Sequence, residues 1–147
     1  ELGGDALAVR LPLLYGDSLG RGRGATDALF AALDAGERPT LFDDEWRTPL
    51  DVSHAAAALV ELALDHATTG VLHLAGPQRM TRLELGLAAL AAQGIPREEA
   101  LRLVRAAPRS ALDLVPARAA DCSLDASRAR ALLAVPLRSP AEALRPA

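Results

Sequence analysis

The side chain best suited to proton transfer in this sequence is its only tyrosine, Tyr15. A phenol exchanges a proton with a substrate when its surroundings bring its pKa toward the working pH. The chain has no lysine that could do this: its 16 basic residues are all arginine, and Leu19 stands four residues after Tyr15. We therefore expect Tyr15 to line a cleft or pack in the core, and we predict no catalytic residue in this chain.

The histidines and the cysteine are not spaced as metal ligands. His54 and His66 lie twelve residues apart on one expected helix, and the single cysteine, Cys122, is remote. Asp51, Ser53 and His54 include the residue types of a hydrolase triad. Neighbours at a helix start cannot take the mutual positions of nucleophile, base and orienting acid. The sequence therefore predicts neither a metal centre nor a hydrolase.

A glycine-rich segment, Gly20 to Gly24, imitates a dinucleotide-binding turn without matching it. The phosphate-binding turn is Gly-x-Gly-x-x-Gly directly after a strand. Here the glycines alternate and stand several residues beyond the apolar run. We expect a solvated loop rather than a dinucleotide phosphate site, and its Arg21 and Arg23 can help to attract an anionic ligand.

The elements that must position these residues alternate between strands and helices, which indicates an α/β fold. Continuous apolar runs bounded by glycines predict buried strands of a parallel sheet. The expected strands are 6–16, 70–76 and a short one at 121–125. The expected helices are 26–35, 53–66, 81–93, 96–104, 126–134 and one that begins near Ser139. Capping boxes at Thr81 with Glu84 and at Ser139 with Glu142 predict two of the helix starts.

Composition narrows the class of protein. With 147 residues, half of them hydrophobic, we expect one compact unit. The net charge of -3 has its signs interspersed, which gives no indication of nucleic-acid binding. Charged residues interrupt every apolar stretch before about 18 residues, so no membrane span is expected. A lone cysteine without a signal peptide favours a cytoplasmic location.

Four stretches in order resemble the C-terminal half of extended short-chain dehydrogenases/reductases, the NAD-dependent epimerase/dehydratase superfamily. They are "VRLPLLYG", "WRTPLDVSHAAAAL", "GVLHLAGPQRMTRLEL" and "RAADCSLDASRARAL". The resemblance is greatest to the dTDP-4-dehydrorhamnose reductase, or sugar nucleotide-binding, branch. It implies a partial Rossmann-like sheet joined to a small α/β substrate-binding subdomain.

The resemblance also implies site residues. Pro12 and Leu13 are similar in position to residues that line the nicotinamide and the sugar, and Tyr15 ends the same strand. Arg47 and Arg118 are similar to the arginines that grip the nucleotide diphosphate, a role that suits their planar forks. The sequence departs from the family at His54, where an aspartate is usual, and at Ala119, where a proline is usual. An alternative for Arg47 is a salt bridge with a nearby acidic residue.

The function implied is the nucleotide-sugar binding portion of an NAD(P)-dependent reductase or epimerase, not catalytic by itself. The family's Tyr-x-x-x-Lys pair and glycine-rich cofactor motif are missing, so we expect residues 1–147 to be a single substrate-binding domain without the N-terminal cofactor-binding half. NAD or NADP is then expected of the full-length family and not of this chain alone. One alternative is a regulatory or assembly subunit that binds a partner enzyme, as in the methionine adenosyltransferase relative. Another is a degenerate fragment that self-associates as a homo-oligomer.

Overall fold

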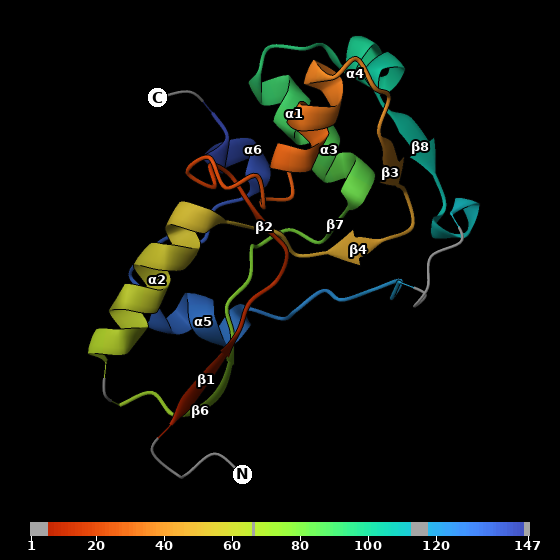
Figure 1. Ribbon diagram of the computed structural model, residues 1–147. Helices are drawn as coiled ribbons and strands as arrows, with labels where there is room; N and C mark the ends of the chain where they lie inside the picture. The colour runs from red at the N-terminus through yellow and green to blue at the C-terminus, as the bar shows by residue number, and fades with distance from the viewer. Residues whose placement is uncertain (1–5, 66, 113–117, 146–147) are drawn as a thin grey trace.

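The computed structural model describes residues 6–65, 67–112 and 118–145, which form a mixed α/β fold with short paired strands (Figure 1). Three of the strand pairs are parallel: β1 (Leu7–Arg10) with β6 (Gly70–His73), β2 (Leu14–Tyr15) with β5 (Leu50–Asp51), and β3 (Thr40–Phe42) with β8 (Arg105–Ala107). The fourth pair, β4 (Trp46–Arg47) with β7 (Met80–Thr81), is antiparallel. The predicted α/β class is confirmed.

The first apolar run forms two strands rather than one. Pro12 has no backbone N–H and cannot continue a hydrogen-bonded ladder. Before it, Arg10 accepts a hydrogen bond from the backbone of Leu74; after it, Leu13 accepts one from Leu50. The chain therefore changes partners at Pro12, from β6 to β5.

The helices lie close to where the sequence places them. They are α1 (Asp27–Asp34), α2 (Val52–Leu64), α3 (Arg82–Ala92), α4 (Arg97–Leu103), α5 (Ser127–Leu132) and α6 (Pro140–Ala143), with a 3₁₀ turn at Arg109–Ala111. Both capping boxes are present, at Thr81 with Glu84 and at Ser139 with Glu142. The expected end of the second helix at residue 66 lies outside the described residues.

The structure differs from the strand predictions in further respects. The strand expected at 121–125 is wrong, because of those residues only Asp121 pairs, in an isolated bridge with Trp46. The pair β3 and β8 was not anticipated. Both strands are three residues long, too short for a clear alternating pattern.

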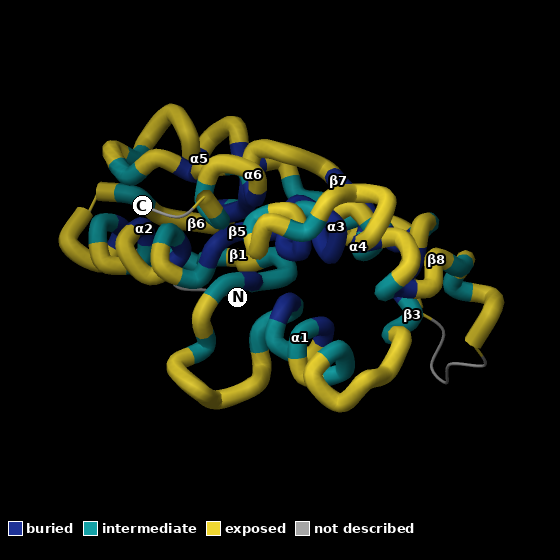
Figure 2. Tube along the Cα trace, turned by 90° about the horizontal axis from the view of Figure 1, so that it is seen from above, coloured by how far each residue is buried: buried dark blue, intermediate teal, exposed yellow. Residues whose placement is uncertain are grey.

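The buried side chains gather on either side of the β4–β7 pair. In Figure 1, α2, α5, β1 and β6 form one half of the molecule, and α1, α3, α4, β3 and β8 form the other. The first half encloses a cluster around Leu50 and Leu72, and the second encloses one around Leu41 and Leu90. The dark segments of Figure 2 follow these clusters through the centre of the molecule. A third cluster contains Tyr15, Met80 and Leu85, so β7 contributes Met80 to the buried interior.

Within the described residues, no helix combines the length and apolar character needed to cross a bilayer.

Candidate functional site

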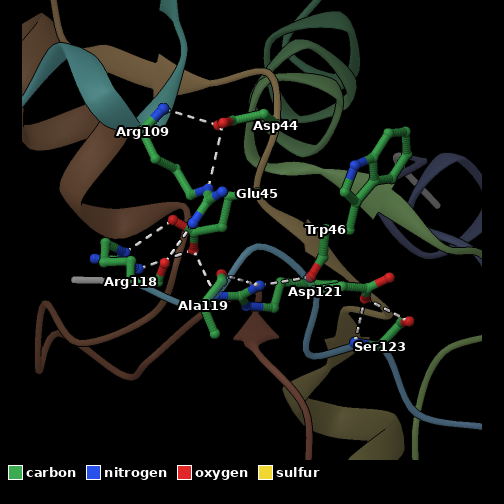
Figure 3. Close-up of polar contacts among 9 residues, drawn as sticks. Asp44, Glu45, Trp46, Arg109, Arg118, Ala119, Asp121 and Ser123 are labelled. Carbon is green, nitrogen blue, oxygen red and sulfur yellow. Dashed lines mark hydrogen bonds and ion pairs between the residues drawn. The ribbon is translucent and has the colours of Figure 1, made fainter.

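A buried carboxylate stands at the start of β4, where Glu45 is 0% exposed. Arg118 binds it with two hydrogen bonds, from Nε to Oε2 at 2.8 Å and from Nη2 to Oε1 at 2.9 Å (Figure 3). Arg47 adds an ion pair, with Nη2 3.0 Å from Oε1. Burying a carboxylate is costly unless charged hydrogen-bond donors satisfy it. The two arginines singled out by the sequence therefore meet at one acidic side chain.

Backbone contacts bring Arg118 to this place. The segment 118–122 runs beside β4, where the Trp46 N–H donates to the carbonyl of Ala120 at 2.7 Å and the Cys122 N–H donates to Trp46 at 3.1 Å. Arg47 ties the same segment down by donating from Nη2 to the Ala119 carbonyl at 3.3 Å. Ala119 stands where the family usually has a proline, and its backbone carbonyl accepts this hydrogen bond from Arg47.

A third arginine, Arg82, belongs to the same cluster and was not singled out from the sequence. It is the first residue of α3, and its backbone N–H donates to the carbonyl of Glu45 at 3.1 Å. Burial lowers the pKa of its guanidinium, the charge of Glu45 opposes this, and the charges of Arg118 and Arg47 add to the lowering. The charge of Arg82 thus interacts with the charges of Glu45, Arg118 and Arg47. The only signal in the sequence is an arginine directly after the helix cap, which says nothing about its neighbours in space.

The neighbouring acidic side chains already have partners. Asp44 accepts from the backbone N–H of Arg109 at 2.8 Å and lies 3.3 Å from its Nε. Asp121 binds Nη2 of Arg79 at 2.8 Å, and the Arg79 guanidinium lies 4.0 Å from the ring centroid of Trp46. Because these two pairs are electrically neutral, the cluster of Arg47, Arg82, Arg118 and Glu45 keeps an excess of two positive charges.

Asp121 provides a pH-dependent test of this neighbourhood. Hydrogen bonds from Ser123, followed by those from Arg79, lower its pKa from 3.8 to about 2. Because the folded-state pKa is the lower one, the resulting stabilisation is present above about pH 4 and is lost as the pH falls toward 2. We expect a carboxyl NMR titration of Asp121 with a midpoint near 2. Ser123→Ala and Arg79→Gln should each raise this midpoint; a variant that leaves it unchanged would contradict the assigned cause.

The residues expected near the cofactor and sugar lie apart from Glu45. Tyr15 is 0% exposed and packs with Met80 and Leu85, while Leu13 borders the same cluster. Among the described residues the Tyr15 hydroxyl has no hydrogen-bond partner, and burial, with the charges of Asp51 and Glu142, raises its pKa. A phenol with a raised pKa is a poor proton donor at neutral pH. Met80 links the two regions, because it also lies opposite Arg47 in the β4–β7 register.

A small cavity of about 170 Å³ adjoins Tyr15. Its lining includes Leu14, Val52 and residues of the glycine-rich loop, among them Ser18 and Arg23. The loop does not suit the pyrophosphate of a dinucleotide. The Asp27 carboxylate occupies the first turn of α1 and accepts from the Gly24 N–H at 2.8 Å, where a phosphate would need free donors.

Asp51, and His54, which departs from the family pattern, take part in local structure at the start of α2. The Asp51 carboxylate caps α2 by accepting from the backbone N–H groups of Ser53 at 2.9 Å and His54 at 3.3 Å. Such a cap satisfies otherwise unpaired helix amides. In the described parts of the chain, no three histidine, cysteine or acidic side chains are grouped as metal ligands.

The short parallel strand pairs and their flanking helices define the class as mixed α/β, a fold shared with parts of solved reductases and epimerases. Within that class, the chain belongs to the family described as "RmlD substrate binding domain", whose model matches residues 1–147.

Solved structures agree with this assignment at the level of the fold. A dTDP-4-dehydrorhamnose reductase from Bacillus anthracis, in complex with NADP, has a TM-score of 0.75 and 15% identity over 94% of this chain and 46% of its own. The Bordetella bronchiseptica enzyme WbmH, in complex with NAD+, has a TM-score of 0.72 and 21% identity over 97% of this chain and 44% of its own. A hypothetical dTDP-4-dehydrorhamnose reductase from Sulfolobus tokodaii has a TM-score of 0.65 and 23% identity over 94% and 45%.

The chain therefore spans less than half the length of these structures. No curated protein matches its sequence.

Proposed function

We propose that residues 1–147 form a single domain that binds a nucleotide sugar for an NAD(P)-dependent reductase or epimerase and is not catalytic by itself. The observation that carries this proposal is the convergence of Arg47 and Arg118 on a cluster with two uncompensated positive charges. The diphosphate of a nucleotide sugar carries two negative charges, so it matches this excess.

Arg118 is the residue best placed to meet the phosphate first. Its side chain is 47% exposed, whereas that of Arg47 is 13% exposed. In this structure Glu45 accepts from the Nε–H and one Nη2–H of Arg118. The half-exposed guanidinium can turn outward and present its planar fork to phosphate oxygens. Arg47, which is more buried, stabilises the negative charge of the bound diphosphate by electrostatic attraction.

Reduction of a sugar requires a proton donor and a hydride source, which we propose that residues 1–147 do not supply by themselves. The buried Tyr15 with its raised pKa is unsuited to act as the proton donor of a reductase. A nicotinamide cofactor would supply the hydride in the complete system. We propose that Pro12 and Leu13, at the bend between β1 and β2, contribute a wall facing that cofactor and the sugar.

Calorimetric titration with dTDP-glucose and dTDP tests this function. Arg118→Gln and Arg47→Gln should each weaken binding by about ten- to a hundredfold, since a hydrogen bond to a charged group is worth about 1.5–3 kcal/mol. Arg128→Gln is the matched control, because Arg128 donates to the carbonyls of Val71 and Thr69 away from the cluster.

Thymidine, which has no phosphate, should bind far more weakly than dTDP. Equal losses in the control and the cluster variants, or no binding of dTDP by the unaltered chain, would refute the proposed site. Oxidation of NADPH by this chain with a dTDP-4-keto sugar would refute the non-catalytic role.

A further inference from the structure

The guanidinium of Arg82, near Glu45, Arg47 and Arg118, has a buried nitrogen, Nη1, that lacks a hydrogen-bond acceptor among the described residues. A buried donor without an acceptor costs stability, and a charged one costs more than a neutral one. The position is nevertheless held by the adjacent backbone, since the Arg82 N–H binds the carbonyl of Glu45. The charge of the Arg82 guanidinium interacts with that of Glu45, whose ion pairs among the described residues are with Arg47 and Arg118.

Binding of an anion creates a conflict at Glu45. The carboxylate needs Arg118 because it is buried, and a phosphate needs the same arginine because it is the most exposed member of the cluster. A phosphate on Arg118 while that arginine still holds Glu45 would place two like charges on one guanidinium, where they repel. If Arg118 simply left, Glu45 would be buried with one partner fewer, which is strongly unfavourable.

We propose that Arg82 resolves this conflict as a positioning residue, taking over Glu45 when Arg118 turns outward to a bound diphosphate. The exchange keeps the buried carboxylate paired in both states, and it gives Nη1 of Arg82 an acceptor in the bound state. Arg47 stays on Glu45 throughout, because it is also anchored to the carbonyls of Trp46 and Ala119. The inference rests on the proposed diphosphate site and adds a rearrangement to it.

The experiment is a double-mutant cycle on binding of inorganic pyrophosphate to the whole chain, measured by calorimetry. Arg82→Met in the otherwise unaltered protein should weaken binding about tenfold, a loss of about 1.4 kcal/mol in binding free energy. In a Glu45→Gln background the same replacement should change affinity by less than about twofold, because no carboxylate then needs a substitute partner.

Other outcomes overturn the inference. An equal loss in both backgrounds would mean that Arg82 contacts the anion directly. No loss in either background would mean that Arg82 is only structural. If Arg118→Gln also leaves pyrophosphate affinity unchanged, the proposed diphosphate site itself fails; if Arg118→Gln weakens binding and Arg82→Met does not, only the exchange fails.

A second variant covers the case in which Arg82→Met loses its native circular dichroism. Arg82→Lys keeps the charge but lacks the planar fork, so it should weaken pyrophosphate binding less than Met and should still lose its effect in the Glu45→Gln background. A persistent effect of the lysine in that background would overturn the exchange.

Discussion

Replacing Gly76 by alanine is expected to cost about 3 kcal/mol or more of folding free energy, a large part of the stability of a typical domain. A Cβ on Gly76 would lie 1.9 Å from the carbonyl oxygen of Pro49. The obstacle is backbone, so it cannot be relieved by rotating a side chain. The Gly76 N–H also donates to the Thr48 carbonyl at 3.2 Å. This contact fixes the segment that follows Arg47 against the end of β6.

Urea unfolding followed by the fluorescence of Trp46, the only tryptophan, would measure this loss as a lower midpoint. Gly86→Ala is the matched control. Its Cβ would lie 2.4 Å from Cδ1 of Leu41, the movable end of a side chain, and alanine is favoured inside α3 by about 1 kcal/mol. We expect a net change within about 1 kcal/mol for this control. Similar losses for both variants would contradict the backbone contact at Gly76.

Replacing Glu45 by leucine is expected to cost about 3 kcal/mol, because three guanidinium groups would then surround no negative charge. We place this cost at the low end for a buried pair, since Arg118 is half exposed and can turn to water. The loss should be partly recovered by sulfate, which can take the place of the carboxylate and bind only the folded state. Thermal unfolding in sulfate and in sodium chloride of equal ionic strength would separate this recovery from general salt effects.

Asp44→Asn provides the comparison for Glu45→Leu. Asp44 also pairs with an arginine, but its side chain is 40% exposed, so its removal should cost less than about 1 kcal/mol. It should also show no specific response to sulfate. If Glu45→Leu were as stable as the unaltered protein, the cluster would not be held together by this carboxylate.

Local signals in the sequence located the helices well. The capping boxes at Thr81 with Glu84 and at Ser139 with Glu142 are present as predicted, because both partners of such a motif lie within one turn. The strands were harder to predict. The break at Pro12 follows from the lost backbone N–H, but the change of partner that accompanies it depends on β5, which lies far along the chain.

The site could be predicted only in part. Arg47 and Arg118 were identified through a family resemblance, and whether they bind a diphosphate stays a prediction. The alternative of a salt bridge for Arg47 is also present in the structure, although its partner Glu45 is buried and shared with Arg118. Arg82 could not be predicted as a site residue, because its position beside Glu45 in the chain's fold depends on the pairing of β4 with β7. No local sequence pattern indicates that pairing.

The amino-acid sequence alone determined that this is an α/β chain of the RmlD substrate-binding type, without a lysine to activate Tyr15. Those properties depend on composition, short motifs and their order. The tertiary structure alone decided that Arg47 and Arg118 share the buried Glu45, that the charge of Arg82 acts on the same carboxylate, and that Tyr15 lies within the core. Charged residues that are distant in the sequence interact only after the β4–β7 pairing and the 118–122 segment bring them together. The pKa of each buried group then depends on its burial and on all the charges around it.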